Sequence, residues 1–271
     1  MKAFIKIGSV LLLSVLFLTT VYAYDGGTAV FCPNNVVEEL DTTYEIWLST
    51  QTCDAIHDMI SAYGDNDLNY FYLNSTSNLR WGLTINTLKT NTNHATIFSK
   101  GHCVPWGDDN IPPYGTGDHF ALLDHDGDYA EDNDHIYAYS SGNENYFVFI
   151  WHCGTALSYP SAEDDDGYYG MPYAFTRDND MDWYGSSGDY VVMAWDWQSP
   201  QFESQVSWQY PNYNWTYAHY AYLVFDYLCD GYSIGESVNY VSWYLGTCSF
   251  YDSGEWGELI GWGNGYLDLP D

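Results

Sequence analysis

Basic residues are scarce in this sequence. Six Lys plus Arg stand against 37 Asp plus Glu in 271 residues, which gives a formal net charge of −31. A protein that binds nucleic acid needs a basic surface to neutralise phosphate, so we expect no nucleic acid partner. Apolar residues, in contrast, are abundant: 46% of the chain is hydrophobic and 19% is aromatic, enough to build a core and to exclude disorder.

Long hydrophobic runs are also missing, except at the N-terminus. Two lysines precede an apolar run from residue 7 to about residue 20, and small residues follow at the two positions that a signal peptidase inspects. The run is short for a membrane-spanning helix, which needs ~20 apolar residues, although an uncleaved anchor is the alternative. We therefore predict a secretory signal peptide at residues 1–23. Residues 24–271 then form a secreted, extracellular domain with no stable membrane insertion.

The six cysteines are few but even in number. They are Cys32, Cys53, Cys103, Cys153, Cys229 and Cys248. In an oxidising compartment such a set indicates disulfides, and local spacing favours Cys32 with Cys53 and Cys229 with Cys248. Zinc is the alternative for the other two, each of which follows a histidine. The chain lacks the close C-x-x-C pairs that structural zinc sites use, so zinc is less favoured.

Apolar runs alternate with helical patterns along the chain. Strands are predicted at residues 28–31, 69–73, 94–99, 146–151 and 190–195, and helices at 45–63, 77–88, 216–228 and 233–245. The last helix begins with Ser233 and Glu236 in the S-x-x-E spacing of a capping box. Continuous apolar strands between helices are typical of an α/β fold, in which a mostly parallel sheet is sandwiched by helices in a single domain.

Two of the predicted strands end at residues that carry chemistry. His102 follows the strand at 94–99, and Cys153 follows the strand at 146–151. Reactive groups of open α/β sheets gather at the carboxyl ends of the strands. A cysteine nucleophile needs an imidazole within reach, because its thiol is mostly protonated at neutral pH. The two residues therefore form a candidate catalytic dyad; the alternative is a structural cysteine beside a loop histidine.

These two strand ends resemble the caspase-like superfamily of cysteine peptidases, which includes caspases, clostripain, legumain and gingipains. In that family one apolar strand ends in a catalytic His, and a second ends in the nucleophilic Cys about 50 residues later. Here the separation is 51 residues (153 minus 102). Residues 225–236 are similar to the family's late helix, turn and helix, and residues 263–270 resemble the closing segment of its secreted bacterial and archaeal members.

The resemblance implies a caspase-like fold and a secreted cysteine endopeptidase that acts on polypeptides. Cys153 would attack the peptide carbonyl and His102 would protonate the leaving amine, with oxyanion donors at Gly101 and Cys103. Basic-specific members of the family carry a carboxylate in the substrate pocket. Asp196, at the end of the strand at 190–195, is the candidate for reading Arg or Lys, and the acidic surface would attract such basic substrates.

The sequence also departs from the family pattern. Cys103 follows His102 where the family has Gly, and Trp151 and His152 replace the small residue that usually precedes the nucleophile. A disulfide between Cys103 and Cys153 would remove the nucleophile, either permanently or as a redox gate. The alternative function is therefore a catalytically inactive surface or binding domain, stabilised by disulfides, whose many aromatic residues suit sugar or protein contacts.

One acidic loop is predicted to bind calcium. Asp124, Asp126, Asp128 and Glu131 place oxygen ligands close together around a glycine. Calcium takes six to eight such oxygens, although the spacing is not that of the helix-loop-helix calcium motif. The alternative is a solvated loop. No cofactor is required for the chemistry itself, so calcium would support the structure.

Overall fold

The protein is described here from a computed structural model. It describes residues 28–32, 41–63, 70–73, 96–106, 119–123, 129–130, 132–137, 146–156, 159–160, 168–176, 190–206, 214–246 and 257–269. The strands are β1 (Thr28–Cys32), β2 (Tyr70–Leu73), β3 (Thr96–Lys100), β4 (His102–Trp106), β5 (His119–Leu123), β6 (Tyr129–Ala130), β7 (Phe147–Trp151), β8 (Tyr159–Pro160), β9 (Tyr168–Tyr169), β10 (Val191–Trp195) and β11 (Leu259–Gly263). The helices are α1 (Thr43–Tyr63), η1 (Asp132–Tyr137), α3 (Met171–Thr176), α4 (Tyr217–Cys229) and α5 (Ile234–Leu245).

A six-stranded sheet forms the centre of the molecule, in the order β11-β10-β7-β3-β1-β2. Neighbouring strands run parallel, except that β11 is antiparallel to β10 at one edge. Every residue of β3, β7, β10 and β11 is buried. Strands buried on both faces need continuous apolar runs rather than alternation, which is the pattern that the sequence shows.

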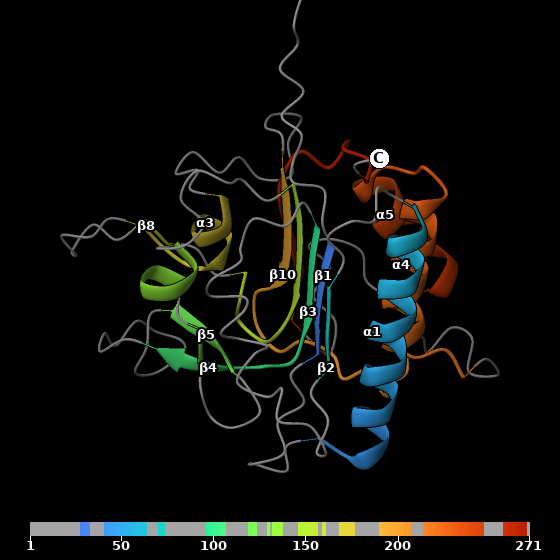
Figure 1. The fold of residues 1–271 in the computed structure, drawn as a ribbon, viewed down its shortest axis with the longest axis horizontal. Coiled ribbons are helices and arrows are strands. Elements are labelled where there is room, and N and C mark those ends of the chain that lie inside the picture. The colour runs from blue at the N-terminus through green and yellow to red at the C-terminus, as the bar shows by residue number, and fades with distance from the viewer. Residues whose placement is uncertain are drawn as a thin grey trace, which may run out of the picture.

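Helices cover both faces of this sheet (Figure 1). On one face lie α1, α4 and α5, and on the other lie α3, η1 and a small antiparallel sheet of β4, β5 and β6. The first face is packed with aromatic rings; the Phe98 ring of β3 meets Phe225 of α4 at 5.1 Å between centroids. The second face buries Leu122, Ile136 and Phe175. The predicted α/β class with a mostly parallel, helix-covered sheet is confirmed.

The start and end of α5 follow local rules of the sequence. The Ser233 hydroxyl accepts the Glu236 amide at 3.4 Å, and the Glu236 carboxylate accepts the Ser233 amide at 3.1 Å. This is the predicted capping box, which satisfies two amides that a helix start leaves without intrahelical partners. Gly246 follows the helix with a φ of 68°, a left-handed conformation that glycine adopts without strain.

Several elements were not predicted from the sequence. They are the small sheet of β4 to β6, the strand pair β8 and β9, the short helices η1 and α3, and the edge strand β11. The predicted helix at 77–88 and the signal peptide at 1–23 lie outside the described residues. Among the helices that are described, none has the length and apolar character needed to cross a membrane.

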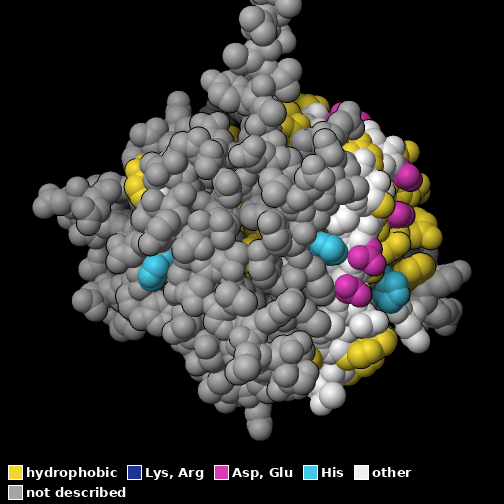
Figure 2. All heavy atoms as spheres, viewed as in Figure 1, with side chains coloured by type: hydrophobic (Ala, Val, Ile, Leu, Met, Phe, Trp, Pro, Cys, Tyr) yellow, Lys and Arg dark blue, Asp and Glu magenta, His cyan; other side chains and the backbone are white. Residues whose placement is uncertain are grey.

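Charge on the described part of the surface is almost entirely negative. Figure 2 shows carboxylates and hydrophobic side chains along the flank formed by α1, α4 and α5, and no Lys or Arg among the described side chains of that view. Lys100 is the single Lys or Arg within the described ranges, and it is buried. No described cation is therefore available on the surface to attract an anionic partner.

Candidate active site

The register of the central sheet brings His102 and Cys153 to the same edge. Strands β3 and β7 are parallel neighbours in which Lys100 lies beside Trp151, an offset of 51 residues (151 minus 100). The same offset separates His102 from Cys153, because each residue stands two positions beyond its paired strand end. The 51 residues between His102 and Cys153 in the sequence therefore equal the offset at which β3 and β7 pair in the sheet. It places the two side chains at the carboxyl ends of adjacent strands, as predicted.

His152 joins the two strand ends. One of its ring nitrogens, Nδ1, lies within hydrogen-bond distance of the His102 carbonyl, and the other, Nε2, lies 2.8 Å from the Ser99 hydroxyl. A carbonyl can only accept, so Nδ1 carries the proton and Nε2 accepts from the serine. Burial lowers the pKa of His152 from 6.5 to about 3, so the ring is neutral. His152 is a structural bridge beneath the site.

Cys153 is surrounded by hydrogen-bond donors. The backbone amide of Ser199 donates to its sulfur at 3.3 Å, and the Ser199 hydroxyl lies 3.5 Å away. Contact with the Cys103 thiol, these Ser199 donors and the His102 charge together outweigh burial and lower the pKa of Cys153 from 9.0 to about 5. Donors that face the sulfur favour its charged form. Cys153 is therefore largely a thiolate at neutral pH, the nucleophilic form of cysteine.

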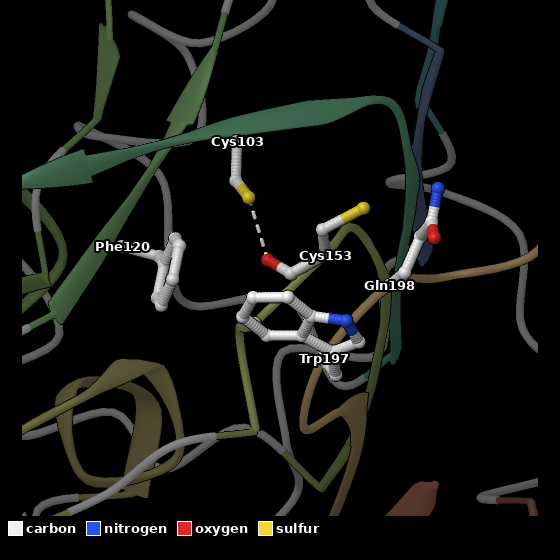
Figure 3. Close-up of a pocket in the computed structure, with 6 residues that line it drawn as sticks. Cys103, Phe120, Cys153, Trp197 and Gln198 are labelled. Carbon is white, nitrogen blue, oxygen red and sulfur yellow. Dashed lines mark hydrogen bonds between the residues drawn. The ribbon is translucent and has the colours of Figure 1, made fainter. Parts of the chain in front are cut away.

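Cys103 lies beside Cys153 and remains a protonated thiol. Its thiol also reaches the backbone of the nucleophile, donating to the Cys153 carbonyl at 2.6 Å (Figure 3). Contact with Cys153 and burial raise the pKa of Cys103 well above its usual value, so it stays protonated. Both residues are free thiols here. The disulfide between them stays a prediction, and the structure has the nucleophile available.

Asp41 holds the His102 ring. Its carboxylate lies 2.8 Å from Nε2 of His102, and the two side chains are 4% and 20% exposed. Burial raises the pKa of Asp41, but the hydrogen bond from His102 and the charge of Lys100 outweigh it and keep the pKa below its usual value. A charged acceptor on Nε2 fixes the ring orientation and leaves Nδ1 as the other ring nitrogen available to exchange a proton. Asp41 is 61 residues from His102 in the chain, and sequence reasoning missed it.

A buried ion pair connects the site to the start of α1. Lys100 Nζ lies 3.0 Å from the Glu45 carboxylate, and these side chains are 4% and 0% exposed. Glu45 also accepts the backbone amides of Phe202 and Glu203 at 2.8 and 2.7 Å. One carboxylate therefore ties the end of β3, the first turn of α1 and the segment that carries Ser199. This network, too, was not foreseen from the sequence.

The backbone amides near the nucleophile are not all available. The Gly101 amide donates to the Trp151 carbonyl at 3.3 Å as part of the sheet, so its predicted role as an oxyanion donor needs correction. The Gly154 amide is likewise used, by the Trp197 carbonyl at 2.6 Å. The amide of Cys153 has no acceptor among the described residues. Among the described residues, the Cys153 amide is therefore the backbone donor next to the Cys153 sulfur that remains available after the end of β7.

A cavity of about 380 Å³ opens beside the nucleophile, within the size range of ligand pockets. Its described lining consists of Cys103, Phe120, Cys153, Gly154, Trp197 and Gln198. Figure 3 shows the Phe120 and Trp197 rings flanking the Cys153 backbone, and the sulfur of Cys153 pointing toward Gln198. The cavity therefore brings the candidate nucleophile and two aromatic rings together around a space large enough for part of a ligand.

Gly154 is required by this geometry. Its φ of 65° is in the left-handed region, which side chains other than glycine adopt with strain. A Cβ on Gly154 would lie 2.6 Å from the Phe120 ring, closer than real Cβ atoms approach a neighbour. The Cys-Gly sequence at 153–154 therefore lets the ring pack directly on the backbone that follows the nucleophile.

Asp196 does not line the cavity. Its carboxylate accepts the backbone amide of Glu258 at 2.6 Å, and burial raises its pKa. The segment after β10 instead contributes Trp197 and Gln198 to the cavity and Ser199 to the nucleophile. That Asp196 selects Arg or Lys stays a prediction, and no contact of Asp196 in the structure supports it.

None of the other predicted site residues that the structure describes lines the cavity. Cys32 and Cys53 are buried free thiols, and burial and contact with Cys32 raise the pKa of Cys53 well above its usual value. Cys229 is also a free thiol, whereas Cys248 lies outside the described residues. The calcium candidates Asp124, Asp126, Asp128 and Glu131 lie outside them as well. The described parts of the chain contain no cluster of three or more metal-ligating side chains.

Comparison with known proteins finds likeness in structure only. No family model and no curated protein matches this chain. The solved structure of pro-sf-caspase-1 is 11% identical, with a TM-score of 0.40 over 90% of this chain and 93% of that one. Caspase-1 from Spodoptera frugiperda is 9% identical, with a TM-score of 0.44 over 92% and 93%. The Drosophila initiator caspase Dronc is 8% identical, with a TM-score of 0.41 over 89% and 80%. Identities and TM-scores this low say nothing about the function of this chain.

Proposed function

We propose that this protein is a cysteine endopeptidase in which Cys153 is the nucleophile and His102 the general acid and base. The observation that carries the proposal is the environment of Cys153: the Ser199 amide donates to its sulfur, and contact with Cys103 together with Ser199 lowers its pKa to about 5. A structural cysteine in apolar surroundings would have a raised pKa instead. A stabilised thiolate beside a histidine that a carboxylate orients is the arrangement of an activated nucleophile.

In the first half of the reaction, the Cys153 thiolate attacks the carbonyl carbon of a peptide bond. The carbonyl oxygen becomes an oxyanion, which the free amide of Cys153 stabilises as a hydrogen-bond donor; the Cys103 amide, on the next strand end, is the second candidate. His102 donates a proton to the leaving amine, and Asp41 stabilises the imidazolium that supplies it. The C–N bond breaks, and a thioester joins the substrate to Cys153.

The second half of the reaction releases the acyl group. His102, now neutral, accepts a proton from water, and the resulting hydroxide attacks the thioester carbonyl. The C–S bond breaks and returns the thiolate to the donors of Ser199 and Cys103. Cys153 and His102 thus act in both halves of the reaction. No metal or organic cofactor takes part in either half. A calcium ion at the acidic loop that contains Asp124 would have a stabilising role only.

The proposed setting is outside the cell. The lysines and apolar run at residues 1–23 support export, and the even number of cysteines suits an oxidising compartment. The acidic surface would attract polypeptides with basic regions, whatever residue is cut. Few Lys and Arg residues also leave trypsin-like proteases few sites at which to cleave this protein.

A cleavage assay tests the proposal. Protein that starts at residue 24 is incubated under reducing conditions with a peptide library of random sequence, and the products are read by mass spectrometry. We expect new peptide termini with the unaltered protein and none with the matched variant Cys153→Ala. If neither protein cuts any peptide, or if both cut equally, the endopeptidase is ruled out. The first of these results would leave the binding-domain alternative in place.

A further inference from the structure

Apart from the Cys153 thiolate itself, the described walls of the cavity carry no charged side chain. Two of them are aromatic, Phe120 and Trp197, and a third is the bare backbone of Gly154. The remaining polar groups are the thiol of Cys103 and the neutral amide of Gln198. Figure 3 shows the Phe120 and Trp197 rings on two sides of the Cys153 carbonyl, and both residues line the cavity.

The charged groups nearest to this cavity are already engaged. Lys100 is buried against Glu45 at 3.0 Å. The Asp196 carboxylate accepts the Glu258 amide at 2.6 Å and is absent from the lining. A carboxylate side chain that entered the cavity would lose its hydration beside the Cys153 thiolate, and a cationic side chain would find only that reactive thiolate as a described counter-ion. An apolar side chain pays no such penalty.

The two rings are also held in place before substrate arrives. Phe120 packs on Gly154, where a Cβ would come within 2.6 Å of the ring. The backbone of Trp197 is held through its carbonyl, which accepts the Gly154 amide at 2.6 Å, and this places the half-exposed ring at the cavity. A preformed, partly exposed aromatic surface binds an aromatic group without a large ordering cost, and ring pairs prefer offset or edge-to-face contacts.

We propose that this cavity selects peptides with a large uncharged side chain, preferentially an aromatic one, at a residue that flanks the scissile bond. The proposal rests on the endopeptidase function above and specifies its substrate class. Phe120 and Trp197 contact the substrate ring, and the Gln198 amide is placed to hydrogen-bond to a tyrosine hydroxyl or to the peptide backbone. The preference for Arg or Lys through Asp196 is the competing hypothesis.

Five quenched fluorescent peptides test this selectivity. They are identical except that one residue flanking the scissile bond is Phe, Leu, Ala, Arg or Asp, and a second set places the residue on the other side of the bond. We expect kcat/KM for the Phe peptide of one set to exceed that for the Ala peptide by about 10–200-fold, the discrimination typical of apolar pockets. Arg and Asp peptides are expected to be no better than Ala.

Three variants identify the cause of the preference. Trp197→Ala is expected to lower the Phe-to-Ala ratio of kcat/KM at least tenfold. Trp243→Ala is the matched control, because Trp243 is 74% exposed on α5 and outside the cavity lining; it should leave the ratio unchanged. Asp196→Asn should also leave it unchanged. If the Arg peptide is the best substrate and Asp196→Asn removes that advantage, the cavity proposal is overturned.

A binding measurement separates selectivity from catalysis. Fluorescein-labelled Phe, Ala and Arg peptides are titrated with the Cys153→Ala variant and followed by anisotropy. Preferential binding of the Phe peptide, without hydrolysis by the unaltered protein, would support the cavity proposal and reject the endopeptidase. Hydrolysis without a preference for Phe or Leu would reject the cavity proposal alone. Neither hydrolysis nor preferential Phe binding would reject both.

Discussion

Alanine in place of His102 is expected to lower kcat/KM for peptide hydrolysis by about 10²–10⁴-fold, the usual contribution of general acid–base catalysis. Without the imidazole, the leaving amine must depart unprotonated and water has no base to activate it. The measurement is kcat/KM for the best peptide substrate across pH 4–9, chosen as about the range in which thiol and imidazole titrate. Unchanged kcat/KM in the variant would contradict the role of His102.

The reactivity of the Cys153 thiol distinguishes this acid–base role of His102 from a role in ionising Cys153. Among the groups that lower the pKa of Cys153, the His102 charge is the smallest, after Cys103 and Ser199. The His102→Ala variant should therefore keep most of its reactivity toward iodoacetamide at pH ~6, which lies between the lowered and the usual thiol pKa. Asp41→Asn, which keeps the shape and removes the charge, should lower kcat/KM less than His102→Ala, because the imidazole stays in place but loses its charged partner.

Methionine in place of Lys100 is expected to lower the free energy of unfolding by about 3–5 kcal/mol, the usual effect of removing one partner of a buried pair. Lys100 is 4% exposed and Glu45 is fully buried, so the variant leaves a carboxylate inside the protein without its cation. Burial alone lowers the pKa of Lys100, but Glu45 and Asp41 outweigh it and raise the pKa, so the lysine is charged at neutral pH. The measurement is urea unfolding at pH 7.

The double variant Lys100→Met with Glu45→Gln is the control. The introduced side-chain amide is uncharged, and its one oxygen can still accept a backbone amide of the segment after β10, so part of the lost stability should return. The same network positions Ser199, and the single variant Lys100→Met should therefore also slow the alkylation of Cys153. Equal urea midpoints for the unaltered protein and Lys100→Met would show that the ion pair contributes nothing to stability.

Much of the fold could be predicted because its signals are local. The runs that became β3, β7 and β10 are continuously apolar, as strands covered on both faces must be, and the Ser233 capping box marks the start of α5. The edge strand β11 was missed because Gly261 and Gly263 interrupt its apolar pattern. The small sheet of β4 to β6 was missed because Pro105 interrupts β4, β6 has only two residues, and the pairing of the strands depends on tertiary contacts.

The candidate site was predictable only in part, for a geometric reason. His102 and Cys153 could be found because their separation equals the register of β3 against β7. Asp41 and Ser199 come from segments 61 and 46 residues away from the side chains they contact, so no local pattern marks them. The Gly101 amide was assigned by resemblance, which does not reveal that the sheet already uses it.

The pH dependence of Cys153 alkylation tests the central claim most directly. Protein that starts at residue 24 is reduced and treated with iodoacetamide between pH 4 and pH 10; labelling of each cysteine is followed by mass spectrometry, and residual peptide hydrolysis is measured in parallel. Because the Cys153 pKa is lowered to about 5 and that of Cys103 is raised, we expect Cys153 to react from about pH 5 upward while Cys103 stays unlabelled. Hydrolysis should fall in proportion to Cys153 labelling. A Cys153 that reacts only near its usual pKa, or full hydrolysis by fully labelled protein, would contradict the account.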